Sequence, residues 1–235
     1  FEGIWSTTVT AITHPDWTID DLFACNCTRE TYEYLDQLLH DPANDHLSAA
    51  DIQQAIRGRN LAAIEGLFTE TAKEYALTYD HADDPSIQCE YFGAFRTVLH
   101  NDPILIEQYE DHISIKGEDM TSDRIIYTDG RSHPENETPS PLGHSIGWYE
   151  GSTLVVETIN VSANIAEDNL PIHNSDEASS IERYTRSEDG SRLHMEFTLI
   201  DPVMFNEPLI LERTRLLTLE VDLLDAPCES ISGEF

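Results

Sequence analysis

The sequence predicts a mainly β protein, namely an antiparallel, up-and-down barrel of about eight strands with a helical N-terminal segment packed over it. Three observations support this fold class. The spacing of apolar residues changes from about 3.6 to 2 near residue 87. Short alternating segments then follow one another at regular intervals, separated by turn residues. Closing such a series into a barrel removes exposed strand edges, which favours a barrel over a sandwich.

The first third of the chain carries the helical pattern. Thr28 stands where it can cap a helix, and residues 41–45 (DPAND) end that helix. Ser48 and Asp51 have the spacing of a capping box, which predicts the start of a second helix. The elements expected here are a lone strand within Phe1–Thr13 and helices over Arg29–His40, from Ser48 through Ile56, and over about Asn60–Tyr79.

The remainder of the chain carries the strand pattern. Asp189 followed by Gly190 between two alternating segments is the strongest short hairpin signal. An eight-stranded barrel leaves room inside for one small ligand. We expect residues 1–86 to form the strand and the helical segment, packed on the barrel, and residues 87–235 to form the barrel domain. The expected strands are Ile104–Tyr109, His112–Lys116, Arg124–Thr128, His144–Tyr149, Thr153–Thr158, Ser180–Ser187, Arg192–Ile200 and Pro208–Leu219.

The net charge limits the classes of partner. The chain has 45 Asp and Glu against 13 Lys and Arg, for a net charge of −32. A surface this negative repels phosphate backbones and anionic membranes, so we expect no nucleic-acid partner and no membrane insertion. The hydrophobic fraction of 40% is too high for a disordered chain. The partner we expect is a small hydrophobic or aromatic molecule, and an oligomer is left open.

The four cysteines indicate an oxidising compartment. We predict a disulfide between Cys89 and Cys228, which would tie the barrel to the C-terminal tail. Cys25 and Cys27 then form either a tight local disulfide or two free thiols. A disulfide is typical of exported proteins, and a chain that begins at Phe1 without Met is consistent with a removed signal peptide. The expected localisation is secreted or periplasmic.

No familiar catalytic signature occurs, but titratable residues interrupt the apolar strands at one place. Glu157 lies in an otherwise apolar strand, and burial inside a barrel would raise the pKa of its carboxyl toward the range of an acid or base. His144 begins the preceding strand and is a candidate general base. Strand alternation does not say which face points inward, so the alternative is that both side chains lie outside.

Asp129 and Arg131 are two further catalytic candidates. Gly130 between them permits a turn that brings the two side chains together. Arg131 is suited to hold a substrate carboxylate or oxyanion with two hydrogen bonds. The alternative is that the pair only stabilises the turn.

Aromatic and imidazole side chains near these residues are candidates for substrate binding, although such side chains also commonly belong to a core. Three histidines can form a zinc site, but the spacing of those in this region is irregular, so we expect no metal and no cofactor. The substrate-binding candidates are His133, His173, Trp148, Tyr149, Tyr109 and Tyr127.

Two motifs dominate this region: TDGRSHP at Thr128–Pro134 and GHSIGWYEGSTLVVET at Gly143–Thr158. They resemble a family of exported, largely uncharacterised bacterial proteins with the pattern DGRxHP, GHSxGxWEGxTLVVxT, His-Ser, Glu-Arg and Asp-Pro. Tyr149 stands where that family has Trp, and Asn174 is inserted in the His-Ser element. The resemblance implies a lipocalin-like barrel and export, and it implies no established reaction. The later elements correspond to His173 with Ser175, Glu182 with Arg183, and Asp201 with Pro202.

Three functions fit these observations. The first is an enzyme that binds a small, largely apolar molecule in the barrel and acts on it by acid/base chemistry of the lyase, isomerase, cyclase or hydrolase type. The second is a non-catalytic carrier of a hydrophobic ligand. The third is an acidic interaction module, which the absence of a calcium-loop spacing disfavours.

Overall fold

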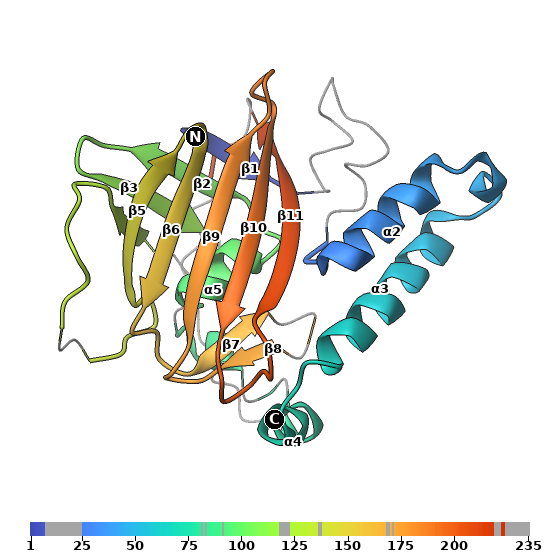
Figure 1. Ribbon diagram of the computed structural model, residues 1–235, viewed down its shortest axis with the longest axis horizontal. Coiled ribbons are helices and arrows are strands. Elements are labelled where there is room, and N and C mark those ends of the chain that lie inside the picture. Colours follow the sequence, from blue (N-terminus) through green and yellow to red (C-terminus); the bar gives the residue numbers. More distant parts are fainter. Residues whose placement is uncertain are drawn as a thin grey trace.

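The computed structural model shows a closed barrel with a helical hairpin projecting from one side (Figure 1). The description covers residues 1–7, 25–80, 82, 84–90, 92–117, 123–135, 138–167, 170, 172–218 and 222–223. In this part of the chain, no helix is both long and apolar enough to cross a bilayer.

Nine strands close the barrel in the order β1-β11-β10-β9-β6-β5-β4-β3-β2. Closure leaves no strand edge exposed, as the sequence predicts. The strands are β1 (Gly3–Ser6), β2 (Ile104–Gln108), β3 (His112–Gly117), β4 (Asp123–Tyr127), β5 (His144–Glu150), β6 (Thr153–Ile159), β9 (Ser179–Arg186), β10 (Arg192–Ile200) and β11 (Leu209–Thr218).

The barrel is mixed, so the expectation of a purely antiparallel meander is wrong at one position. β4 and β5 pair in parallel, with Ile126 opposite Ser145 and Tyr127 opposite Ile146. A parallel pair needs a connection that returns to the starting end of the sheet, and residues 128–143 provide it. These residues include the first of the two motifs.

Two further elements differ from the sequence-based expectation. The N-terminal strand is not alone, because β1 pairs with β2 on one side and with β11 on the other and completes the barrel. A separate two-stranded sheet of β7 (Asn164–Glu167) and β8 (Ile172–Asn174) lies beside one end of the barrel (Figure 1).

The first predicted helix is confirmed, and so are its cap and the capping box of the second. α2 spans Arg29–His40, and the Thr28 side chain accepts a hydrogen bond from a first-turn amide. Ser48 and Asp51 form the reciprocal bonds of the capping box of α3 (Ala49–Glu65). The predicted third helix is instead divided between α3 and α4 (Glu70–Thr78).

Thr69 causes that division. Its side chain caps α4, and its backbone amide donates to the Met204 carbonyl, outside any helix. Gly66, a weak helix former, ends α3 just before this contact.

The α2–α3 hairpin contacts the barrel near the start of α2 and does not cover the barrel (Figure 1). Arg29 binds Glu212 of β11 at 2.6 Å, and the Tyr32 and Thr214 hydroxyls lie 3.0 Å apart. The two helices share a small apolar cluster of their own, which includes Leu35, Ile52 and Ile56. The hairpin therefore has a core separate from that of the barrel.

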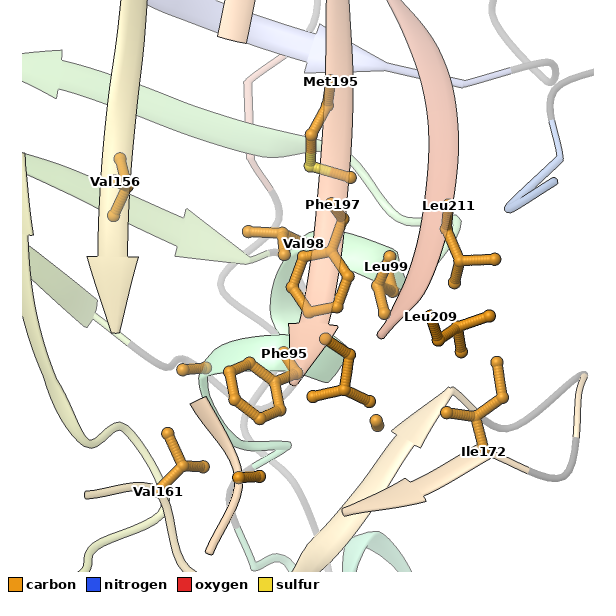
Figure 2. Packing of buried hydrophobic residues seen from close by; sticks show 14 of the residues in the cluster. Phe95, Val98, Leu99, Val156, Val161, Ile172, Met195, Phe197, Leu209 and Leu211 are labelled. Atoms are coloured by element: carbon orange, nitrogen blue, oxygen red, sulfur yellow. The ribbon is translucent and has the colours of Figure 1, made fainter. Parts of the chain in front are cut away.

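A short helix, α5 (Gly93–Leu99), packs against the inward-facing side chains of the strands, and all seven of its residues are buried. Figure 2 shows Phe95 of α5 against Phe197 of β10, with ring centroids 5.6 Å apart in an edge-to-face arrangement. Val98 and Leu99 belong to the same cluster of buried apolar residues. α5 therefore forms part of the core with these strand side chains, and the predicted ligand space inside the barrel stays a prediction.

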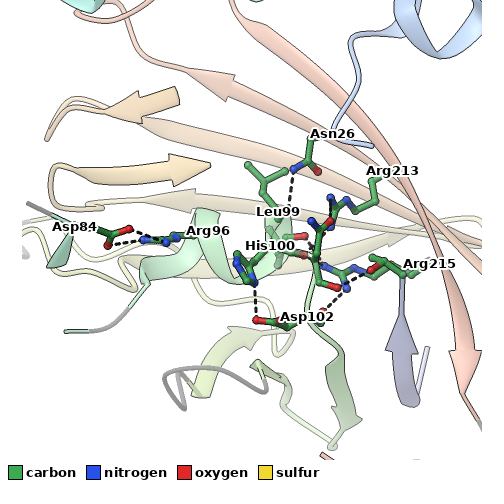
Figure 3. Close-up of polar contacts among 11 residues, drawn as sticks. Asn26, Asp84, Arg96, Leu99, His100, Asp102, Arg213 and Arg215 are labelled. Atoms are coloured by element: carbon green, nitrogen blue, oxygen red, sulfur yellow. Dashed lines mark hydrogen bonds and ion pairs between the residues drawn. The ribbon is translucent and has the colours of Figure 1, made fainter. Parts of the chain in front are cut away.

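Two buried arginines of β11 hold the C-terminal end of α5 (Figure 3). Arg215 donates to the carbonyls of Val98 and His100 at 3.0 and 2.6 Å, and Arg213 donates to the His100 carbonyl at 2.6 Å. A cation at this end opposes the partial negative charge of the terminal carbonyls. Burial lowers the pKa of Arg215 to about 9, which leaves it charged at neutral pH.

The cysteine prediction is resolved for one pair. Cys25 and Cys27 form a disulfide bond, which is the tight local loop and not two free thiols. Cys89 also takes part in a disulfide. Its predicted partner, Cys228, lies outside the described residues, so the Cys89–Cys228 pairing stays a prediction.

Candidate functional site

The strand faces decide where the candidate residues lie. On β6, Leu154, Val156 and Thr158 are almost fully buried, and the two apolar side chains belong to the main core. Glu157 alternates with them, so its side chain lies on the outer face, where it is 40% exposed. The prediction that Glu157 lines the barrel cavity is therefore wrong, and the alternative of an outer position is confirmed.

His144 lies on the same outer face. On β5 the buried Ser145 and Gly147 point inward, so His144 and Ile146 point outward. Ile146 stands opposite Glu157 in the register of β5 and β6. Glu157 and His144, which were candidates to meet inside the barrel, are therefore near neighbours on its outer face.

The β4–β5 connection brings a third titratable group to this place. Nδ1 of His133 lies 2.8 Å from Nδ1 of His144, which is hydrogen-bonding distance. Nε2 of His133 lies 3.5 Å from a carboxylate oxygen of Glu157 and is buried without a hydrogen bond. The three side chains form a carboxylate–imidazole–imidazole cluster, which we call the outer cluster.

The Glu157 carboxylate determines which nitrogens carry protons. Its negative charge favours a proton on the facing Nε2 of His133. Nδ1 of His133 is then the acceptor, so His144 must donate from its own Nδ1. In this arrangement His144 carries its proton on Nδ1. The outer cluster thereby links Glu157 to His144 through His133.

Asp129 and Arg131 pair with each other, as the sequence predicts. Two carboxylate oxygens of Asp129 receive hydrogen bonds of 2.6 to 3.1 Å from the Arg131 side chain. This pairing lowers the pKa of Asp129 to about 2, so Asp129 stays ionised and is a poor general base at neutral pH. Arg131 also lies 3.7 Å from the centre of the Tyr127 ring, which in turn stacks on His144 at 5.3 Å.

Comparison with protein-family models, with curated proteins and with solved structures finds no match. The resemblance of the two motifs to an exported bacterial family therefore stays a prediction.

The predicted aromatic residues are spread over the barrel surface. Trp148 shares the outer face of β5 with His144 and is 39% exposed. Tyr149 is 49% exposed, and its hydroxyl accepts a hydrogen bond from Gln108 at 2.8 Å. Tyr109 is 51% exposed and stacks on His112. Their roles in substrate binding stay predictions, and Trp148 shares a strand face with the outer cluster.

His173 does not join the outer cluster, so its predicted place beside the other histidines is wrong. It lies on β8, buried against the rings of Tyr75 and Tyr79 at 4.4 and 4.9 Å. Burial lowers the pKa of His173 from 6.5 to about 4, although the charge of Asp84 opposes the shift. A neutral imidazole in this position joins α4 to the small β7–β8 sheet.

The low pKa of His173 predicts a specific dependence of stability on pH. Between pH 6.5 and about 4 the unfolded chain binds a proton at this residue and the folded chain does not, so stability falls as the pH falls. The contribution is on the order of 2–3 kcal/mol over this window. The variant His173→Phe should lack this pH-dependent part of the free energy of unfolding. Urea denaturation at pH 7 and at pH 4 measures the difference. His112→Gln, a change at a surface histidine, should keep the wild-type slope, and an unchanged slope in His173→Phe would contradict the assignment.

No group of three or more His, Cys, Asp or Glu side chains within the described ranges is arranged to hold a metal ion. A half-open pocket of about 340 Å³ lies elsewhere, between the residues before α5 and the strand β7. It is lined by Pro85, Cys89, Glu90, Pro141, Ser162, Ala163 and Asn164.

Sequence reasoning missed one polar site, which lies inside the barrel. Arg124 and Glu182 are fully buried and bind each other through two hydrogen bonds of 3.0 and 2.7 Å. The remaining contacts of Arg124 go to Ser145 and Thr158, and Glu182 also accepts from Ser180 and Tyr184. The available sequence signal was that strand alternation places Arg124 on the same face of β4 as Ile126. Because every charge is satisfied and shielded from solvent, this network has a structural role.

Proposed function

We propose that the protein is an enzyme that moves a proton on a small, largely apolar molecule, with His144 as the proton-accepting residue. The observation that carries the proposal is the outer cluster, in which a carboxylate, an imidazole and a second imidazole follow one another at 3.5 and 2.8 Å. Such a series orients the terminal imidazole and stabilises the positive charge that it gains. The reaction class that fits is a lyase, isomerase or cyclase, with a hydrolase also compatible.

The surroundings support an apolar or aromatic substrate. Ile146 lies between His144 and Trp148 on the outer face of β5, and the Trp148 indole is partly exposed. A planar molecule stacked on Trp148 would lie on the same face as His144. Arg131 is already paired with Asp129, so it offers less to a substrate carboxylate than the sequence suggests.

Export is part of the same proposal. The Cys25–Cys27 disulfide supports a secreted or periplasmic location, because disulfides persist in oxidising compartments.

The variant Glu157→Gln tests the proposal. It removes the charge that fixes the tautomer of His133 and keeps the shape of the side chain. We expect the rate of proton abstraction from 5-nitrobenzisoxazole to fall by about 100-fold. In this aromatic probe, loss of a proton from carbon breaks the N–O bond in the same step and gives a nitrile and a phenolate. The melting temperature should change by only a few degrees, because Glu157 is partly exposed. Absorbance of the phenolate product gives the rate.

Glu30→Gln is the matched control, because Glu30 is an exposed carboxylate on α2 that pairs with Arg59 of α3, outside the barrel. It should keep the wild-type rate. Imidazole ¹⁵N NMR gives a second measurement that needs no substrate, since it reports which nitrogen of each histidine is protonated. A wild-type rate no higher than that of Glu157→Gln, or a protonated Nε2 on His144, would refute the proposal.

A carrier is the second candidate, and the pocket of about 340 Å³ near α5 is the observation that favours it. Apolar side chains of Pro85, Pro141 and Ala163 line it beside the polar Glu90 and Asn164. A carrier should retain a stoichiometric apolar ligand, which native mass spectrometry and organic extraction would detect.

A further inference from the structure

We propose that the Cys25–Cys27 disulfide is a thiol–disulfide exchange site that oxidises dithiols of cationic partner proteins or peptides. The bond closes a loop with only one residue between the cysteines. A disulfide stabilises a fold mainly by restricting the unfolded chain, and this effect is smallest for the shortest loops. The fold therefore gains little from this bond, which directs attention to its chemistry.

The two sulfur atoms are placed differently. Cys27 is completely buried, whereas Cys25 is only partly buried at the edge of the α2–α3 cluster. Of the two residues, the partly buried Cys25 is therefore the one that we expect an incoming thiolate to attack. Attack on Cys25 makes Cys27 the leaving group.

The position of Cys27 favours its departure as a thiolate. It immediately precedes Thr28, the N-cap of the 12-residue helix α2. The positive end of the helix dipole stabilises the negative charge that develops on a sulfur placed there, which favours its departure. The backbone of Cys27 is also fixed to β11 by two hydrogen bonds with Glu212, of 3.2 and 2.7 Å, so its position does not depend on the disulfide.

The exchange balances in two steps. A partner thiolate attacks Sγ of Cys25, a mixed disulfide forms, the Cys25–Cys27 bond breaks, and Cys27 leaves as a thiolate that takes a proton from solvent. A second thiolate of the partner then attacks its own sulfur in the mixed disulfide and releases Cys25, which is also protonated. The partner dithiol loses two electrons and becomes a disulfide, and the Cys25–Cys27 pair gains these two electrons.

The charge of the chain selects the partner. With a net charge of −32, the chain attracts cationic dithiols and repels anionic thiols such as glutathione. Arg29, the nearest cation in sequence, is neutralised by Glu196 and Glu212. The preference for a cationic partner should decrease with salt, because salt screens exposed charges.

A single-turnover experiment tests this inference. The oxidised chain is mixed with two reduced peptides that have the same cysteine spacing, one rich in Lys and one rich in Glu. The Lys-rich peptide should be oxidised at least about tenfold faster at low salt, and the difference should shrink at high salt. Alkylation followed by peptide mass spectrometry should place the new thiols on Cys25 and Cys27 and none on Cys89.

Variants determine the order of attack. Cys27→Ser should trap a Lys-rich peptide that has a single cysteine, supplied as its thiopyridyl disulfide, on Cys25 with release of thiopyridone, whereas Cys25→Ser should trap much less on the buried Cys27. The double variant Cys25→Ser/Cys27→Ser should oxidise no peptide yet keep the wild-type circular dichroism spectrum. Equal peptide oxidation by the double variant would overturn the proposal. So would thiols that appear on Cys25 and Cys27 only after the wild-type chain has been unfolded, a result that does not depend on how any variant folds.

Discussion

Replacing Glu182 with Gln is expected to lower the free energy of unfolding by about 3–5 kcal/mol, because it leaves the Arg124 charge buried without a counter-charge. Both side chains are almost completely inaccessible, so water cannot compensate for the lost carboxylate. The same substitution replaces one acceptor oxygen with an NH₂ group, which is a donor. Arg124, Ser180 and Tyr184 all donate to this carboxylate, so one of them would face another donor. The urea midpoint should fall accordingly.

The double variant Arg124→Met/Glu182→Leu provides the contrast. Removing both charges together should restore most of the stability lost in Glu182→Gln, since an apolar pair needs no desolvation of ions. The exposed pair Arg183–Glu150 is the control, and Glu150→Gln should cost at most about 1 kcal/mol. If Glu182→Gln were as mild as Glu150→Gln, the buried network would not have the role assigned to it.

Replacing Phe95 with Ala is expected to cost about 3–5 kcal/mol and to open an apolar cavity in the core. Phe95 is 1% exposed and packs edge-to-face on Phe197, and its helix is buried along its whole length (Figure 2). The residual cavity should be dry and should bind a small apolar molecule such as benzene. Thermal denaturation with and without benzene would measure both effects.

Leu77→Ala is the matched control for this prediction. Leu77 is also an apolar residue of a helix, but it is 87% exposed, so its truncation should change stability by no more than about 0.5 kcal/mol. A Phe95→Ala protein as stable as Leu77→Ala would mean that α5 contributes little to the core. Stabilisation of the wild-type protein by benzene to the same extent would mean that ligand space is already present.

Local features of the fold were predictable because short-range interactions determine them. Thr28 and the Ser48–Asp51 capping box fix helix starts through hydrogen bonds within three residues. The Asp189–Gly190 turn and the alternation in β9 and β10 identify a hairpin for the same reason. The parallel pairing of β4 with β5 left no such mark, since it depends on where the chain returns after residues 128–143.

The candidate site was predictable in its members but not in its place. His133, His144 and Glu157 stood out as titratable residues between apolar strands, and the structure brings these three together. His173 had the same appearance in sequence but lies on a separate sheet. Spacing along the chain does not distinguish a residue on the β4–β5 connection from one on β8.

The sequence by itself determined the starts of α2 and α3, most strand segments of the barrel, the acidic composition and the candidate side chains, because each depends on composition or on neighbours along the chain. Only the tertiary structure decided which strand face points inward. A period of two gives each strand two faces, and their assignment depends on what they pack against. Here α5 and the Arg124–Glu182 pair occupy the inside. Glu157 and His144 therefore lie outside, where the β4–β5 connection supplies His133.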